Sequence, residues 1–124
     1  MITLPAAAAA RIQSHVAGEE GPSGGIYDWA RALGGIALHG TIGAVWFLRP
    51  DGTFWQFEEL GDPISPLPSQ LETGALVLGS KRHPWISALL PARSVNAVSC
   101  HACNGIGYWE PGFFCGACGG LGWL

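Results

Sequence analysis

The residues best suited to chemistry are four cysteines in two C-x-x-C pairs, Cys100 with Cys103 and Cys115 with Cys118. They are all the cysteines in the 124-residue sequence. Each pair continues in the same way, so the sequence contains two C-x-x-C-x-G-x-G units. A tetrahedral Zn²⁺ site needs four ligands, and two such pairs supply four thiolates from two backbone turns. The pattern therefore predicts one structural zinc ion, Zn2+, bound by these cysteines.

The repeated unit resembles the cysteine-rich zinc-binding region of DnaJ-type co-chaperones, which carries four such repeats and two zinc ions. The two repeats in this chain run from Cys100 to about Trp123, so the resemblance implies half of that region and a single zinc ion. By position it implies Cys100, Cys103, Cys115 and Cys118 as the ligands. The His-Pro-Asp tripeptide of a J-domain does not occur in the sequence. The resemblance therefore implies a zinc module that contacts proteins, without implying chaperone activity.

Disulfide bonding and thiol redox chemistry are the alternative uses of the cysteines. A redox C-x-x-C pair usually lies at a helix N-terminus, where the dipole lowers a thiol pKa, whereas glycines follow both pairs here. The apolar segment 1–10 has no basic residue before it, unlike a secretory signal, and no stretch is long enough to span a membrane. We therefore expect a reduced, cytoplasmic protein, which favours metal. His101 lies between two ligands but is not needed, because four cysteines fill the site.

Aromatic residues surround the cysteines, and they are the candidates for binding a partner: Tyr108, Trp109, Phe113, Phe114 and Trp123. Either they pack onto the rest of the chain, or they form an exposed patch that anchors a partner. No Lys or Arg lies between residues 100 and 124, and the formal net charge is −3. Nucleic-acid binding requires basic residues, so we expect a protein partner. With only 12% charged residues, the composition also favours a homo-oligomer.

The fold class expected for the rest of the chain is α+β, beginning with two helices. An alanine run predicts a helix over residues 4–17, and apolar residues at helical spacing predict another over 25–33. A small antiparallel sheet follows, with strands over 36–39, 44–49 and 53–59. The segment Pro50-Asp51-Gly52 predicts the hairpin turn between the last two strands.

The second half of the chain is less regular. Residues 61–69 contain three prolines and are expected to be a loop. Residues 75–78 are either a buried strand or part of a helix that begins near residue 69, because periodicity cannot decide over so short a run. Pro84 is expected to begin a short helix. We therefore expect an α+β domain over 1–98 and a zinc module over 99–124.

The sequence shows no arrangement of residues typical of an enzyme, so we expect a non-enzymatic zinc protein that binds another protein. One alternative is an inhibitor of a bacterial toxin, because two helices before a compact sheet resemble the SUKH-type immunity proteins. An acidic groove would favour that alternative, and its candidates are Glu58, Glu59, Asp62 and Glu72. A further alternative is a thiol-disulfide redox protein that uses the C-x-x-C pairs.

Overall fold

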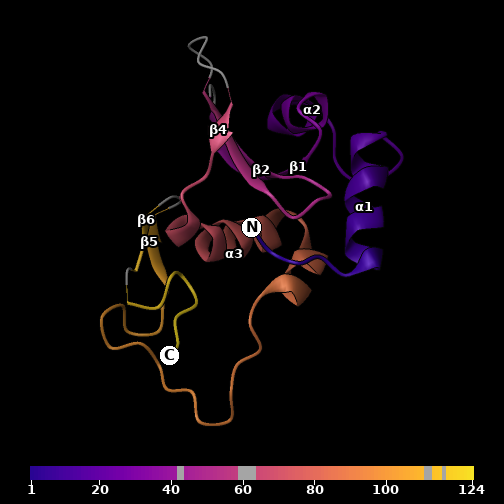
Figure 1. The fold of residues 1–124 in the computed structure, drawn as a ribbon. Helices are drawn as coiled ribbons and strands as arrows, with labels where there is room; N and C mark the ends of the chain where they lie inside the picture. The colour runs from indigo at the N-terminus through magenta and orange to yellow at the C-terminus, as the bar shows by residue number, and fades with distance from the viewer. Residues whose placement is uncertain (42–43, 59–63, 111–112, 116) are drawn as a thin grey trace. The chain divides into compact units, whose positions relative to one another are not determined.

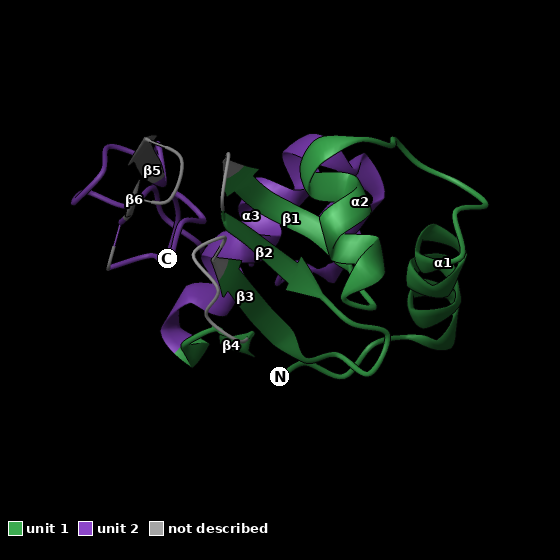
Figure 2. Cartoon of the chain, turned by 90° about the horizontal axis from the view of Figure 1, so that it is seen from above, with its two compact units in different colours: residues 1–69 green, residues 70–124 purple. Residues whose placement is uncertain are grey.

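The computed structural model describes residues 1–41, 44–58, 64–110, 113–115 and 117–124. The chain divides into two compact units, residues 1–69 and 70–124, which Figure 2 shows in green and purple. The four cysteines lie in the second unit, together with the helical segment that precedes them. The predicted boundary between residues 98 and 99 lies inside this unit.

The first unit opens with the two predicted helices, α1 (Ala6–Val16) and α2 (Gly25–Ala32), labelled in Figure 1. The alanine run favours α1 through its high helix propensity. Arg31 on α2 joins the end of α1 to the connecting loop, because its guanidinium donates hydrogen bonds to the carbonyl oxygens of His15 (2.6 Å) and Glu20 (3.1 Å).

The sheet of this unit has four antiparallel strands in the order β1-β2-β3-β4. Its strands are β1 (Ile36–Thr41), β2 (Ala44–Leu48), β3 (Phe54–Glu58) and β4 (Ser65–Pro66). The β2–β3 hairpin is confirmed. Its turn is closed by the N–H of Arg49, which donates to the carbonyl of Thr53, and by the N–H of Gly52, which donates to the carbonyl of Arg49, both at 3.0 Å.

The core of the first unit lies between α2 and the sheet. Ala30 of α2, Ala37 of β1, and Val45 and Phe47 of β2 are completely buried there. Partly buried aromatic side chains surround them, and the rings of Trp29 and Phe57 meet edge to face with centroids 6.0 Å apart. Burial of this apolar surface is the main force that holds the helix on the sheet.

Strand β4 lies in the segment that we expected to be a loop. Ser65 pairs with Gln56, and Pro66 pairs with Trp55, at the edge of the sheet. Proline is tolerated in an edge strand because its missing N–H can face away from the ladder. Turn-forming residues dominate this segment, so the sequence pattern concealed the short pairing.

The second unit contains α3 (Glu72–Arg82), which follows a 3₁₀ turn, η1 (Ser69–Leu71). The helix interpretation of residues 75–78 is therefore correct, and the strand interpretation is wrong. The helix buries Ala75, Leu76 and Leu78, with Gly74 and Gly79 beside them. The expected helix at Pro84 is a 3₁₀ helix, η2 (Pro84–Leu89), in which Ile86 is buried.

The remainder of this unit contains the strands β5 (Tyr108–Glu110) and β6 (Phe113–Phe114), which pair with each other. The fold is therefore α+β, as expected. The longest helices, α1 and α3, have 11 residues each. Within the described ranges, no helix combines the length and apolar character required to cross a membrane.

Candidate metal centre

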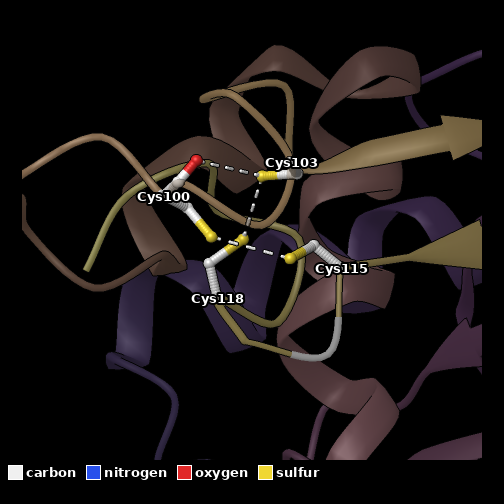
Figure 3. Close-up of side chains that lie close together, drawn as sticks. All are labelled: Cys100, Cys103, Cys115 and Cys118. Atoms are coloured by element: carbon white, nitrogen blue, oxygen red, sulfur yellow. Dashed lines mark hydrogen bonds between the residues drawn. The ribbon is translucent and has the colours of Figure 1, made fainter.

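The four cysteine side chains converge on one point, as Figure 3 shows. Their Sγ atoms all lie within 4.8 Å of one another. The four residues are 0–6% exposed, so the cluster is shielded from solvent. All four are free cysteines. The structure therefore confirms that the two C-x-x-C pairs come together as a group that could hold a metal ion.

The spacing of the sulfurs fits a tetrahedral metal site. The Sγ atoms of Cys100 and Cys115 are 3.6 Å apart, and those of Cys103 and Cys118 are 3.7 Å apart. A tetrahedron with Zn–S bonds of about 2.3 Å has edges of about 3.8 Å. Two opposite edges of the cluster thus have nearly the length that zinc requires. A tetrahedral set of four soft thiolates selects zinc or iron over hard cations.

Backbone N–H groups support the second cysteine of each repeat in the same way. The N–H of Gly107 donates to Sγ of Cys103, and the N–H of Gly122 donates to Sγ of Cys118, both at 3.2 Å. In each repeat the donor lies four residues after the acceptor. Such outer bonds orient metal ligands and stabilise the thiolate, which is the form that binds a metal.

The first cysteine of each repeat has a distinct electrostatic environment. The N–H groups of Cys118 and Ala117 lower the pKa of the Cys115 thiol, against the opposing effect of burial. Burial raises the pKa of the Cys100 thiol, and its hydrogen bond with Cys115 raises it further. Because the two sulfurs are in contact, they titrate as a pair rather than as independent groups.

The two repeats are joined by a reciprocal pair of backbone hydrogen bonds. The N–H of Cys100 donates to the carbonyl of Gly122 at 3.0 Å, and the N–H of Cys115 donates to the carbonyl of Gly107 at 2.9 Å. In each case the first residue of one repeat bonds to the last residue of the other. The repeats are therefore related by approximate two-fold symmetry, and each completes the hydrogen bonding of its partner.

The last glycine of each repeat is required by this close pairing. Gly107 and Gly122 have φ angles of +87° and +85°, which L-residues with side chains rarely adopt. A Cβ atom on Gly107 would lie 2.4 Å from the carbonyl oxygen of Gly120. A Cβ atom on Gly122 would lie 2.5 Å from the carbonyl oxygen of Gly105. Each final glycine therefore provides the space in which the backbone of the other repeat lies.

The predicted partner-binding aromatics are only partly described. Tyr108 and Trp109 belong to β5, Phe113 and Phe114 belong to β6, and the side chains of all four lie outside what the structure describes. Trp123 is half-buried and lies opposite Ser99 in an isolated antiparallel bridge. A partner-binding role for these aromatics stays a prediction.

Exposed aliphatic side chains also occur in this unit, at positions that were not among the sequence candidates. Val98 and Leu124 exchange two backbone hydrogen bonds of 3.0 and 2.9 Å, and both are 57% exposed. Residues paired in this way present their side chains on the same face of the ladder. Ile106, in the first repeat, is 60% exposed. In the sequence pattern these residues look like buried aliphatic residues. The one sign that they could be exposed is that they lie beside or within the C-x-x-C-x-G-x-G repeats.

The remaining sequence candidates lie outside the cluster. His101 is exposed and is not among the four grouped ligands. Of the proposed acidic groove, Glu72 begins α3, whereas Glu59, Asp62 and the side chain of Glu58 lie outside the described residues. The groove therefore stays a prediction.

Comparison of the chain with models of known protein families, with curated proteins and with solved structures finds no match. The likeness to DnaJ-type and SUKH-type proteins thus remains a resemblance of motif and element order. The metal interpretation rests on the geometry of the four cysteines.

Proposed function

We propose that this protein is a non-enzymatic zinc protein whose C-terminal unit is held together by one structural Zn²⁺ ion and serves as a protein-interaction module. The observation that carries the proposal is the convergence of four buried Sγ atoms, with two opposite sulfur pairs at 3.6 and 3.7 Å. Four thiolates complete a tetrahedral shell and leave no open position for water or substrate, which favours a structural ion over a catalytic one.

A structural ion has a clear role in this part of the chain. Residues 91–106 contain no helix, and their isolated bridge residue, Ser99, pairs with Trp123. Such irregular backbone buries little apolar surface of its own, so cross-linking by a metal compensates for a small core. Binding of structural zinc contributes on the order of 10 kcal/mol to the folding of comparable peptides.

Native mass spectrometry on protein purified without chelator tests the metal. We expect one zinc ion per chain, and its loss in Cys118→Ser. The matched control is His101→Ala, which changes an exposed neighbour outside the ligand group and should retain the metal. A chain without metal, or a Cys118→Ser variant that binds zinc as well as the parent does, would contradict the structural site. The same spectrum reports monomer or oligomer.

The interaction part of the proposal is supported by the exposed apolar pair Val98 and Leu124 on the zinc unit. Residues 94–109 include no Asp, Glu, Lys or Arg, so a partner would meet little fixed charge near this pair. Neutral, apolar surface of this kind suits contact with protein better than contact with nucleic acid.

The corresponding experiment compares the proteins retained by the parent chain with those retained by a Val98→Lys, Leu124→Lys variant. Val95→Lys is the matched control, because Val95 is fully exposed in the same unit. We expect partners to be lost only from the double variant, while all three proteins bind zinc equally. Retention of the same proteins by the double variant would contradict a contact at this surface.

A further inference from the structure

Two contacts between sulfurs in the cluster cross from one repeat to the other. The first cysteine of one repeat faces the first of the other, since Sγ of Cys100 is 3.6 Å from Sγ of Cys115. The second cysteines face each other likewise, since Sγ of Cys103 is 3.7 Å from Sγ of Cys118. Figure 3 shows both contacts as dashed lines between the repeats.

We infer that these contacts define a second, metal-free state, in which oxidation links the repeats through the disulfides Cys100–Cys115 and Cys103–Cys118. This pairing differs from the one expected of a C-x-x-C redox protein, which would join cysteines within each repeat. Disulfide formation needs no metal, so this inference can be tested independently of the zinc site.

The chemistry is ordinary thiol–disulfide exchange with a small disulfide such as oxidised glutathione. A cysteine thiolate attacks one sulfur of the oxidant, forms a mixed disulfide and releases glutathione thiolate. The facing cysteine of the other repeat then loses its proton, attacks the protein sulfur of the mixed disulfide and releases a second glutathione. Each protein disulfide thus forms with the loss of two hydrogens from the cysteine thiols, and one oxidised glutathione is reduced to two glutathione thiols.

The backbone already holds the two repeats together, as cross-repeat disulfides would. The reciprocal hydrogen bonds from Cys100 to Gly122 and from Cys115 to Gly107 join backbone atoms, so oxidation of the sulfurs leaves them in place. Two cross-repeat disulfides would preserve this arrangement and would replace the metal as the link between the repeats. Disulfides within each repeat would close only short loops and would leave the repeats without a covalent link.

Burial determines when such oxidation occurs. The four cysteines are at most 6% exposed, so a reagent as large as glutathione reaches them only when the unit opens. A bound metal would hold the thiolates and oppose that opening. We therefore expect oxidation to follow removal of the metal, and the full chain must be treated with chelator first.

The sequence allows the pairing to be read directly from a chymotryptic digest. Tyr108, Trp109, Phe113 and Phe114 lie between the two cysteine pairs, so cleavage after them places each pair on a separate peptide. The full chain is treated with chelator and oxidised glutathione, alkylated, denatured and digested, and its peptides are identified by mass before and after reduction.

We expect the oxidised monomer to lose two hydrogens for each disulfide, and its two cysteine peptides to appear as one linked species that separates on reduction. Separate peptides with internal disulfides, links between chains only, or thiols that stay free would each overturn the inference. Zinc binding without cross-repeat disulfides would retain the metal proposal and reject this one. Cross-repeat disulfides in a chain that binds no zinc would support this inference and reject the metal proposal.

Double variants resolve which cysteines pair and remain informative if the oxidised full chain gives a mixture. Cys103→Ser with Cys118→Ser retains the facing pair Cys100 and Cys115. Cys103→Ser with Cys115→Ser, the matched control, retains a diagonal pair. We expect the disulfide to form faster in the first variant, and equal or reversed rates would overturn the assigned pairing.

Discussion

Substitution of Gly107 by alanine tests whether the two repeats are held as closely as the structure indicates. Gly107 has φ +87°, and an added Cβ would meet the carbonyl oxygen of Gly120 at 2.4 Å. Gly105 is its matched control, since it has a similar φ of +78° but its added Cβ would meet nothing closer than 3.7 Å. The two variants share the conformational strain and differ in the steric clash.

The expected magnitudes follow from these two terms. The left-handed conformation costs alanine roughly 1–2 kcal/mol, which Gly105→Ala should show alone. The clash in Gly107→Ala is with backbone, which cannot rotate aside, and adds about 1–3 kcal/mol. Because metal binding and folding are coupled, the loss should appear as weaker zinc affinity. At tenfold per 1.4 kcal/mol, we expect roughly 5- to 30-fold weakening for Gly105→Ala and about 30-fold to a few thousand-fold for Gly107→Ala.

Competition with a chromophoric zinc chelator measures both affinities in one buffer. The informative quantity is the ratio between the variants, because it removes the conformational strain that they share. Equal affinities for Gly105→Ala and Gly107→Ala would refute the close approach of the repeats. A loss much larger in Gly105→Ala would refute the assignment of which glycine faces the other repeat.

Two further predictions concern the first unit. Burial lowers the pKa of His15 below 6.5, although Glu20, 3.7 Å away, raises it. As the pH falls, the unfolded chain therefore takes up this proton before the folded chain does. The free energy of unfolding should fall as the pH drops below about 6.5. Urea unfolding at about pH 7.5 and about pH 5.5 should show that decrease in the free energy of unfolding, and the decrease should be smaller in His15→Gln. An equal decrease in the variant and the parent would contradict the assignment to His15. Phe47→Ala should lower the free energy of unfolding by about 3–5 kcal/mol because Phe47 is completely buried, whereas Val95→Ala, at a fully exposed residue, should change it by less than about 0.5 kcal/mol. Similar urea midpoints for those two variants would contradict the placement of the core.

The first half of the fold was largely predictable because its signals are local. Proline, aspartate and glycine between two aromatic runs determine the hairpin at residues 50–52 through turn geometry alone. Asp51 reinforces it, because its carboxylate accepts a 3.0 Å hydrogen bond from the N–H of Thr53. Such features require no knowledge of distant residues.

Elements that depend on distant contacts were harder to predict. Residues 75–78 form only part of a helix, and the glycines on both sides obscured its length. Glycine has low helix propensity, and burial of the helix's apolar residues compensates for it. Strand β4 exists because β3 offers an edge to Ser65 and Pro66, which local propensity cannot reveal.

The grouping of the four cysteines was predictable from their spacing, but the pairing of the repeats was not. C-x-x-C spacing specifies that two sulfurs reach one ion, and it does so for each repeat independently. It does not state which sulfur of one repeat faces which sulfur of the other. That relation depends on the bonds of Cys100 to Gly122 and of Cys115 to Gly107, whose partners are far apart in sequence.

The reciprocal bonds between the repeats have a consequence for how this unit acquires metal. A lone repeat would retain two sulfurs but would lose the acceptor for the N–H of its first cysteine, so neither half is complete alone. Assembly should therefore be all-or-none, with half-formed species scarce at every metal concentration.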